Sequence, residues 1–239
     1  MNALTLEGVH THIGAYHILH GVDLSVPKGM VTMLLGRNGA GKTTTLRTIM
    51  GLWRASRGNI RFDGKDVTTL STPAISKMGI AYVPEHMGIF ADLTVKENML
   101  LAAREAKRVE DLDETRLKWI FRLFPAVEKF WGTQAGKLSG GQKQMLAVAR
   151  AIVEPRDLLI VDEPSKGLAP AIVNNMIDAI EQLKATGVTT LLVEQNVNFA
   201  KRLGDYVAVM DDGVIVHKGS MSEFSNDVRL QQSLLGLAL

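Results

Sequence analysis

The stretch Gly36-Arg-Asn-Gly-Ala-Gly-Lys-Thr-Thr44 satisfies the P-loop pattern G-x-x-x-x-G-K-[ST] through Gly36, Gly41, Lys42 and Thr43. It follows the apolar run Val31-Thr-Met-Leu-Leu35 and precedes a segment compatible with a helix, which is the strand-loop-helix setting that the pattern requires. The sequence therefore predicts an α/β fold of the P-loop NTPase class, in which this loop binds a nucleoside triphosphate.

Each part of the predicted loop has a role in binding phosphate. Glycines let backbone N–H groups approach phosphate oxygens, and the helix that follows offers its positive N-terminus to the same anion. Lys42 is expected to reach the β- and γ-phosphates, and Thr43 to place its hydroxyl on Mg²⁺. The predicted nucleotide-binding residues of the loop are Gly36, Arg37, Asn38, Gly39, Ala40, Gly41, Lys42, Thr43 and Thr44.

Length and composition are those of a globular protein. The chain has 239 residues, of which 46% are hydrophobic and 22% are charged. The net charge is +2 and no basic run is interleaved with aromatics, so we expect no nucleic-acid partner. The absence of cysteine excludes disulfides and is compatible with the cytoplasm. No segment resembles a secretory signal or reaches the ~20 apolar residues that span a bilayer, so we expect any membrane role to require partners.

The first third of the chain predicts an antiparallel β layer around the loop. Apolar and polar residues alternate from 3 to 26, which is typical of half-buried strands. Ile60 and Phe62 alternate in the same way ahead of an Asp63-Gly64 turn and predict one more short strand. These strands are expected to form a small sheet of their own.

The character of the sequence changes after about residue 88. Thr94 and Glu97 form a capping box that predicts the start of a helix, and residues 107–114 are charged and expected to be exposed. A helical stripe follows, which we interpret as core and not as a ligand site: Leu117, Ile120, Phe121 and Phe124. We predict a single domain, residues 1–239, with a helical subdomain at about 88–150 inserted in a core of 1–87 and 151–239.

The last third returns to alternating strands and helices, which predicts a parallel sheet. The expected elements are strands at 158–161 and 189–193, with a helix at about 171–185 between them. Residues 206–210 and 214–218 flank an Asp-Asp-Gly turn and predict a hairpin, and residues 227–239 predict a short helix. The core is thus expected to hold a mixed sheet.

Two adjacent carboxylates, Asp162 and Glu163, end the apolar run Leu158-Leu-Ile-Val161. In P-loop ATPases an aspartate at this position holds Mg²⁺, usually through water, and a neighbouring glutamate can polarise the attacking water. We therefore predict that Asp162 is the metal partner and that Glu163 is the catalytic base. An ordinary solvated acidic pair is the alternative, and the upstream P-loop disfavours it.

The pentapeptide Leu138-Ser-Gly-Gly-Gln142 precedes a second predicted helix. Ser139 and Gln142 form a capping box, so Ser139 is expected at the helix N-terminus, with Gly140 and Gly141 exposing backbone donors. This arrangement predicts either a second anion-binding surface or a simple N-cap. Physical chemistry leaves both readings open.

These three motifs, in this order, resemble the ATPase subunits of ABC transporters, and the resemblance covers the whole chain. The pentapeptide is highly specific to that family. The resemblance implies that two subunits pack head to tail, with ATP between the P-loop of one and Ser139, Gly140, Gly141 and Gln142 of the other. It also implies ATP and Mg²⁺ as cofactors, and a D-loop at 165–168 that links the two sites.

Three positions depart from the common pattern of that family. Glu85 stands where most relatives have the Q-loop glutamine, and a carboxylate can still ligate Mg²⁺ or orient water. Gln195 replaces the switch histidine and cannot become cationic. Ile13 replaces the aromatic residue that stacks on adenine, and Tyr16 is a candidate to compensate. The resemblance thus gives Glu163, Gln195 and Glu85 as catalytic residues and Thr43, Asp162 and Glu85 as metal ligands.

The strings around Glu85, Pro164 to Pro170 and Gln195 are similar to one subgroup, the second ATPase subunit of branched-chain amino acid importers, whose kin drive uptake of urea and short amides. Lys166 stands where that subgroup more often has an apolar residue. The resemblance implies a motor subunit on the inner face of the plasma membrane, with integral membrane permeases, a second ABC ATPase subunit and, indirectly, an extracytoplasmic substrate-binding protein. The alternative is a soluble ABC ATPase of cofactor assembly without a membrane partner.

Overall fold

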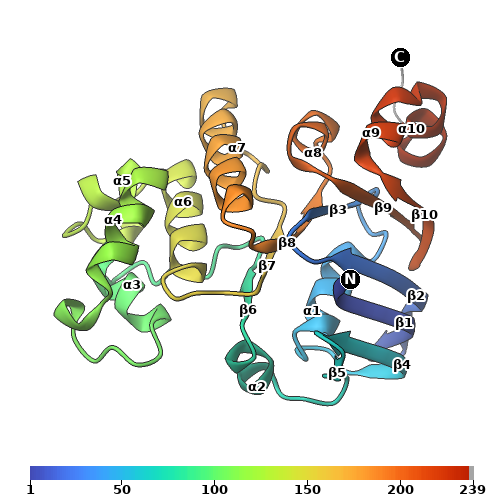
Figure 1. Cartoon of the computed structure of the whole chain (residues 1–239), viewed down its shortest axis with the longest axis horizontal. Coiled ribbons are helices and arrows are strands. Elements are labelled where there is room, and N and C mark those ends of the chain that lie inside the picture. The colour runs from blue at the N-terminus through green and yellow to red at the C-terminus, as the bar shows by residue number, and fades with distance from the viewer. Residues whose placement is uncertain (237–239) are drawn as a thin grey trace.

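A computed structural model describes residues 1–236 of the chain, and its strands form two sheets (Figure 1). The strands are β1 (Asn2–Ile13), β2 (Tyr16–Pro27), β3 (Val31–Leu35), β4 (Ala55–Phe62), β5 (Lys65–Asp66), β6 (Ile80–Val83), β7 (Leu158–Asp162), β8 (Thr189–Glu194), β9 (Tyr206–Asp211) and β10 (Val214–Ser220). The α-helices are α1 (Lys42–Ile49), α2 (Thr72–Lys77), α3 (Val95–Ala102), α4 (Glu114–Leu123), α5 (Pro125–Lys129), α6 (Gly140–Ala151), α7 (Pro170–Ala185), α8 (Val197–Leu203), α9 (Met221–Asn226) and α10 (Val228–Leu235). Two 3₁₀ helices are η1 (Val109–Asp111) and η2 (Ala135–Lys137).

The six-stranded sheet positions the site, and its strand order is β10-β9-β3-β8-β7-β6. Strands β3, β6, β7, β8 and β9 run parallel to their neighbours, and β10 pairs antiparallel with β9. Every residue of β3, β7 and β8 is buried, as expected for strands covered on both faces. The predicted mixed sheet is confirmed. Because parallel strands end at the same edge, the loops after β3, β6, β7 and β8 lie together there.

Each face of this sheet has its own hydrophobic core, because successive side chains of a strand point to opposite faces. Leu34 of β3 belongs to the core shared with α1 and the antiparallel sheet, whose strand order is β2-β1-β4-β5. Its neighbours Met33 and Leu35 belong to the core shared with α3, α4, α6 and α7. The predicted N-terminal β layer is therefore confirmed, and it covers one face of the main sheet.

The segment between β6 and β7 is helical, and Figure 1 shows its helices gathered on one side of the molecule, away from β1 and β2. The capping box that begins α3 is confirmed, since Thr94 Oγ1 accepts from the Glu97 N–H at 3.3 Å and Glu97 Oε2 accepts from the Thr94 N–H at 2.7 Å. The predicted apolar stripe is core: Ile120 and Phe124 are buried. The expectation that residues 107–114 are exposed is wrong for Leu112, which is buried against the same core.

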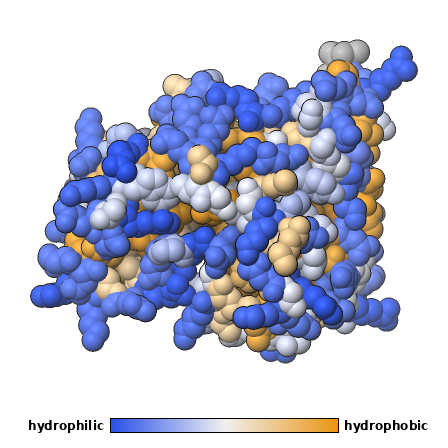
Figure 2. Space-filling view, in the orientation of Figure 1, coloured by the Kyte–Doolittle hydropathy of each residue, from blue (hydrophilic) through white to orange (hydrophobic). Residues whose placement is uncertain are grey.

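The C-terminal hairpin of β9 and β10 is confirmed, and its turn residues Asp212 and Gly213 have φ angles of 41° and 74°. The sequence did not predict that β9 pairs with β3 and so extends the main sheet. The helix predicted at 227–239 is α10, and residues 237–239 lie outside the described part of the chain. Within residues 1–236, no helix is long and apolar enough to cross a bilayer. Figure 2 shows that the face in view is mainly hydrophilic, with apolar side chains between charged ones.

Candidate nucleotide-binding site

The loop between β3 and α1 has a backbone that requires glycine at its start. Gly36 has a φ angle of 153°, and a Cβ atom there would collide with the carbonyl oxygen of Met210 in β9. Gly41, the N-cap of α1, has a φ angle of 105° and makes no side-chain cap. The N–H groups of the first turn of α1 are therefore not capped by a side chain of the N-cap residue, and a helix N-terminus of this kind favours an anion.

Lys42 lies across this loop with its ammonium buried. Its side chain is 4% exposed, and Nζ donates to the carbonyl oxygens of Gly36 at 2.9 Å and Arg37 at 3.0 Å. Nζ is also 3.8 Å from Glu163 Oε1. Burial lowers the pKa of Lys42, and the nearby Glu163 and Asp162 carboxylates oppose that shift. The ammonium is thus held where phosphate oxygens bound to the loop would meet it.

Asp162, the last residue of β7, is fully buried next to the start of α1. Its Oδ1 accepts from Thr43 Oγ1 at 3.2 Å, and its Oδ2 accepts from Tyr82 Oη at 3.4 Å. Burial raises the pKa of Asp162. Burial and the facing Asp162 raise the pKa of Tyr82 to about 12. The structure therefore brings together the two residues predicted to share Mg²⁺, and it adds Tyr82, which the sequence did not single out.

Glu163 follows in a left-handed conformation, with a φ angle of 48°, and its N–H donates to the carbonyl oxygen of Val193 at 2.9 Å. Non-glycine residues adopt this conformation at a cost and are found disproportionately at functional sites. Glu163 Oε1 accepts from Gln195 Nε2 at 2.5 Å, and Oε2 is 3.2 Å from Lys166 Nζ. Two residues predicted to be catalytic, from the loops after β7 and β8, are therefore in direct contact.

Lys166 connects the third predicted catalytic residue to the other two. Its Nζ donates to Glu85 Oε1 at 2.5 Å while also pairing with Glu163. These two carboxylates raise the pKa of Lys166. From the sequence alone, Lys166 was a minor discrepancy with relatives. The structure shows it as the cation that joins the loop after β6 to the loop after β7.

Glu194, at the end of β8, is a further residue that sequence reasoning missed. It is 2% exposed, and burial raises its pKa. Its Oε1 accepts from the Ser165 N–H at 2.9 Å, and its Oε2 accepts from the Gln195 N–H at 3.1 Å. Glu194 therefore ties the segment that carries Lys166 to the residue that contacts Glu163. Its position beside Gln195 at the end of an apolar strand was the available signal.

A cavity of about 350 Å³ opens over this arrangement. Its lining residues are Ile18, Asn38, Gly39, Gly41, Lys42, Thr43, Thr44, Glu85, Glu163 and Lys166. Six of them belong to the predicted loop, and Ile18 of β2 was not predicted. Gly36, Arg37 and Ala40 do not line the cavity, and the Arg37 guanidinium lies against Gly236. The cavity is polar and is lined by Lys42, Thr43, Glu85 and Glu163, whereas the predicted residues Asp162 and Gln195 lie behind its lining, in contact with Thr43 and Glu163.

The two residues considered for adenine stacking lie elsewhere. Ile13 and Tyr16 face each other across the turn between β1 and β2, and neither lines the cavity. The Tyr16 side chain projects into solvent, at 74% exposed. Beside them the rings of His12 and His17 stack with their centroids 4.2 Å apart. A role for Ile13 or Tyr16 at adenine stays a prediction.

The pentapeptide forms the N-terminus of α6, as predicted. Ser139 N–H donates to Gln142 Oε1 at 2.9 Å, and Gln142 N–H donates to Ser139 Oγ at 3.3 Å. A Cβ atom on Gly141 would lie 2.6 Å from Ile172 Cγ2 in α7, whereas a Cβ atom on Gly140 would meet nothing within 4 Å. None of these residues lines the cavity of its own chain. The capping box is confirmed, and the anion-binding surface stays a prediction.

Comparison with known proteins decides the family. The family model described as ABC transporter matches residues 19–166, more than half of the chain. The chain belongs to the ABC transporter family. It is 37% identical to the high-affinity branched-chain amino acid transport ATP-binding protein BraG of Pseudomonas aeruginosa, over 98% of this chain and 99% of that protein. It is 35% identical to the probable branched-chain amino acid transport ATP-binding protein LivF of Archaeoglobus fulgidus, over 92% and 93% of the two chains.

Solved structures agree with this ABC assignment. The crystal structure of an ATP-binding cassette of an ABC transporter in its ADP conformation superimposes with a TM-score of 0.83, at 26% identity, over 97% of this chain and 98% of that one. The predicted fold class is therefore confirmed, and the chain is an ABC ATPase.

Proposed function

We propose that the chain is the ATP-hydrolysing motor of an importer for branched-chain amino acids or related amides. The supporting observation is the end-to-end similarity to BraG, 37% identity over 98% of this chain. Similarity to the two Archaeoglobus fulgidus relatives falls from 35% for LivF to 30% for LivG, which favours the LivF type of subunit. The lining of the cavity supports the motor role, because Lys42, Glu85 and Glu163 all reach it.

The residues at the end of β7 fit a magnesium ion. Asp162 is a buried carboxylate whose hydrogen-bond donors are the hydroxyls of Thr43 and Tyr82, and its raised pKa reports a negative charge that burial disfavours. No three His, Cys, Asp or Glu side chains form a metal cage in residues 1–236. Mg²⁺ needs none, since it takes one or two protein oxygens together with phosphate oxygens and waters. We assign Thr43 and Asp162 as its protein partners, with Glu85 nearby.

Different residues of the chain then perform different steps of ATP hydrolysis. Lys42 binds the β- and γ-phosphates, and Glu163 accepts the proton of the attacking water while Gln195 fixes its orientation. Mg²⁺, when bound, neutralises charge on the phosphate oxygens. Lys166 pairs with both Glu85 and Glu163 and so links the loop after β6 to the loop after β7.

Two copies of the cassette complete the site in this proposal. Ser139, Gly140 and Gly141 at the N-terminus of α6 do not reach the cavity of their own chain. Gly140 nevertheless has open space over its Cα. We propose that this helix N-terminus meets the γ-phosphate bound to a second ABC ATPase, either an identical chain or a different one.

A groove beside the cavity is the proposed contact with a permease. It has a volume of about 510 Å³ and is lined by Arg47, Leu52, Trp53, Tyr82, Pro84 and His86. Leu52 is 51% exposed at its rim. Exposed apolar side chains around a groove favour protein binding, and Tyr82 connects this groove to Asp162. Binding there would hold the chain on the inner face of the plasma membrane, with the substrate-binding protein on the opposite side.

The test is to purify the tagged full chain from its own membranes in detergent. We expect two integral membrane proteins to copurify, and we expect Leu52→Asp to lose them while keeping its affinity for ATP. Val228→Asp is the matched control, because Val228 is 53% exposed on α10 and lies outside the groove. Deleting the gene should abolish uptake of radiolabelled leucine. Recovery of soluble partners alone, with normal uptake, would instead indicate a cofactor-assembly ATPase.

A further inference from the structure

The lining of the P-loop cavity includes a second ammonium group besides that of Lys42, the one carried by Lys166. The two lysines are held in different ways. The Lys42 side chain is buried and donates to two backbone carbonyls, whereas the Lys166 side chain is 54% exposed and pairs with two carboxylates. Lys42 is therefore a fixed part of the loop, and Lys166 can leave its partners by rotation of an exposed side chain.

A short turn places the Lys166 side chain over Glu163. The Lys166 N–H donates to the carbonyl oxygen of Glu163 at 3.2 Å, and the preceding Ser165 N–H donates to the buried Glu194 carboxylate at 2.9 Å. Lys166 Nζ lies 3.2 Å from Glu163 Oε2, an oxygen that is buried and accepts no hydrogen bond. Lys166 therefore compensates the charge of Glu163 and leaves that oxygen open to another donor.

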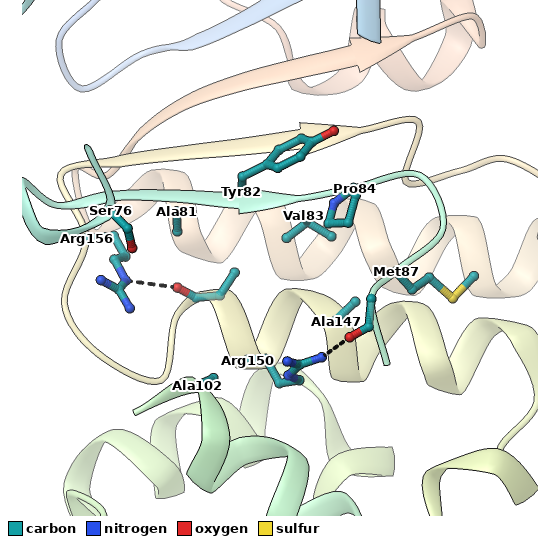
Figure 3. Close-up of a pocket in the computed structure, with 12 residues that line it drawn as sticks. Ser76, Ala81, Tyr82, Val83, Pro84, Met87, Ala102, Ala147, Arg150 and Arg156 are labelled. Atoms are coloured by element: carbon teal, nitrogen blue, oxygen red, sulfur yellow. Dashed lines mark hydrogen bonds between the residues drawn. The ribbon is translucent and has the colours of Figure 1, made fainter. Parts of the chain in front are cut away.

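The loop after β6 brings Glu85 to the same ammonium group. Figure 3 shows the start of this loop at Pro84, and Arg150 Nη1 of α6 donates to the Gly88 carbonyl oxygen at 2.5 Å farther along it. The Glu85 side chain is 43% exposed, and its Oε1 accepts from Lys166 Nζ at 2.5 Å. Because the backbone is held at Gly88, this pair can open through its two side chains alone.

Lys166 and a bound magnesium ion would compete for the same carboxylates. Burial raises the pKa of Asp162, and the charges of Glu163 and Glu85 raise it further, so the three carboxylates lie close enough to interact. A divalent cation beside Asp162 would repel the Lys166 ammonium. Mg²⁺ also prefers oxygen ligands, and an exposed ion pair such as that of Lys166 with Glu85 contributes little free energy. The metal is therefore the stronger partner for Glu85.

We propose that Lys166 is a positioning residue that takes the place of the metal at Glu85 before nucleotide binds. Its ammonium holds Glu85 beside Glu163, and Glu85 passes from Lys166 to the metal when Mg²⁺ binds with ATP. This inference rests on the magnesium assignment of the proposed function. It makes nucleotide binding open the link between the loops after β6 and β7. Direct contact of Lys166 with the γ-phosphate is the alternative, and it predicts an effect of the opposite sign.

Binding of Mn²⁺ to the full chain with a non-hydrolysable ATP analogue tests the proposal. Mn²⁺ takes the same oxygen ligands as Mg²⁺, and electron paramagnetic resonance measures the free ion directly. Lys166→Gln removes the competing ammonium, and we expect it to bind Mn²⁺ about three- to fivefold more tightly than wild type. Lys166→Arg keeps the charge and should stay within about twofold of wild type.

Lys118→Gln is the matched control for the lost charge. Lys118 is an exposed lysine of α4 that pairs with Glu114 at 2.6 Å, and it lies outside the P-loop cavity. This variant should bind Mn²⁺ as tightly as wild type. Circular dichroism checks that each variant folds.

A double-mutant cycle with Glu85→Gln assigns the effect to the pair. If Lys166 competes for Glu85, adding Lys166→Gln to Glu85→Gln should give little of the gain in Mn²⁺ affinity. A full gain in that background would reveal a general charge effect and refute the proposal. Wild-type crystals grown with Mn²⁺ and the analogue depend on no variant, and in them Lys166 Nζ should lie beyond ion-pair distance of Glu85.

The remaining outcomes separate this inference from the function on which it rests. Weaker binding of both Mn²⁺ and the analogue by Lys166→Gln would overturn the proposal and make Lys166 a phosphate ligand. Equal Mn²⁺ affinity in Lys166→Gln and wild type would contradict the proposal alone and leave the magnesium assignment intact. A wild-type chain that binds no Mn²⁺ with the analogue would refute the magnesium assignment and this inference together.

Discussion

The helix N-termini of α1 and α6 both follow glycine-containing turns, yet their surroundings differ. At α1 the N-cap Gly41 provides no side-chain cap, and buried Lys42 and Asp162 lie beside it. At α6 the Ser139 and Gln142 side chains satisfy one another's backbone N–H groups. We infer that these charged groups, Lys42 of α1 itself and Asp162 at the end of β7, favour phosphate binding at α1. The α6 terminus lacks those groups within its own chain.

The glycines of α6 sharpen this difference. Gly141 has a structural explanation, because a Cβ atom there would press into Ile172 of α7. Gly140 has none, since a Cβ atom there would meet open space. If the α6 N-terminus binds the phosphate of a second cassette, a side chain at position 140 would not disturb the single chain but would obstruct that phosphate in the dimer.

The largest expected effect comes from removing the proposed base at the α1 site. Glu163→Gln keeps the shape of the side chain and its contact with Gln195, but it cannot accept a proton. We expect ATP hydrolysis to fall by about 10²–10⁴-fold while ATP affinity stays within a few-fold of wild type. Phosphate release and equilibrium nucleotide binding measure the two quantities.

Glu128→Gln is the matched control, because Glu128 is an exposed glutamate on α5 outside the cavity. It should hydrolyse ATP at the wild-type rate. Wild-type turnover in Glu163→Gln would refute the base assignment and leave the α1 end as a binding site only.

The contrast between α1 and α6 also shows what sequence could supply. The P-loop pattern, the strand that ends in Asp162 and Glu163, and the capping box at Ser139 are local signals, and each one is where the sequence placed it. Strand order is not local. The contact of Asp162 with Tyr82 depends on β6 lying next to β7, and no short pattern encodes that neighbour.

The reach of long side chains is a second feature that the sequence does not predict. In the sequence Lys166 stands out only as a difference from the subgroup that the chain resembles, yet its side chain reaches both Glu85 and Glu163. The register of the β1–β2 hairpin is a third feature that the sequence does not predict, because β-bulges shift it. As a result Ile18 lines the cavity, and Ile13 and Tyr16 do not. Short helices such as α2 and α8 were missed because so few residues give no clear periodicity.

The next effect tests the α6 end with two neighbouring substitutions. Gly140→Ala should leave Tm unchanged or slightly raised, because alanine favours helix and meets no neighbour. It should lower ATP hydrolysis about tenfold, equivalent to about 1.4 kcal/mol, by obstructing the phosphate of a second cassette. Gly141→Ala should instead destabilise the fold by about 1–3 kcal/mol through its clash with Ile172.

Calorimetry and steady-state hydrolysis, measured on the same preparations, separate these two outcomes. Full activity in a well-folded Gly140→Ala variant would show that α6 is a simple N-cap. In that case the α1 site would work without a second chain.

The smallest effect concerns the charge that makes the α1 site different from α6. The folded-state pKa of Asp162 is raised, so the folded chain binds this proton more tightly than the unfolded chain does. Wild-type stability therefore has an unfavourable contribution that sets in as pH rises above the ordinary value of 3.8 and is complete above the raised pKa. Asp162→Asn does not titrate and should gain stability relative to wild type across that window, by a few degrees in Tm at pH 8.

Glu194→Gln is the informative control for this substitution. The Glu194 pKa is also raised by burial, but its carboxylate accepts from the backbone N–H groups of Ser165 and Gln195. An amide supplies one acceptor oxygen where the carboxylate supplies two, so this variant should lose stability at pH 8 and not gain it. Adding Mg²⁺ and ATP should reverse the order for Asp162→Asn, because wild type then gains a cation beside the buried charge. An Asp162→Asn chain that is less stable than wild type at pH 8 without nucleotide would mean that Thr43 and Tyr82 already compensate the charge, and the case for a cation at this end of β7 would fail.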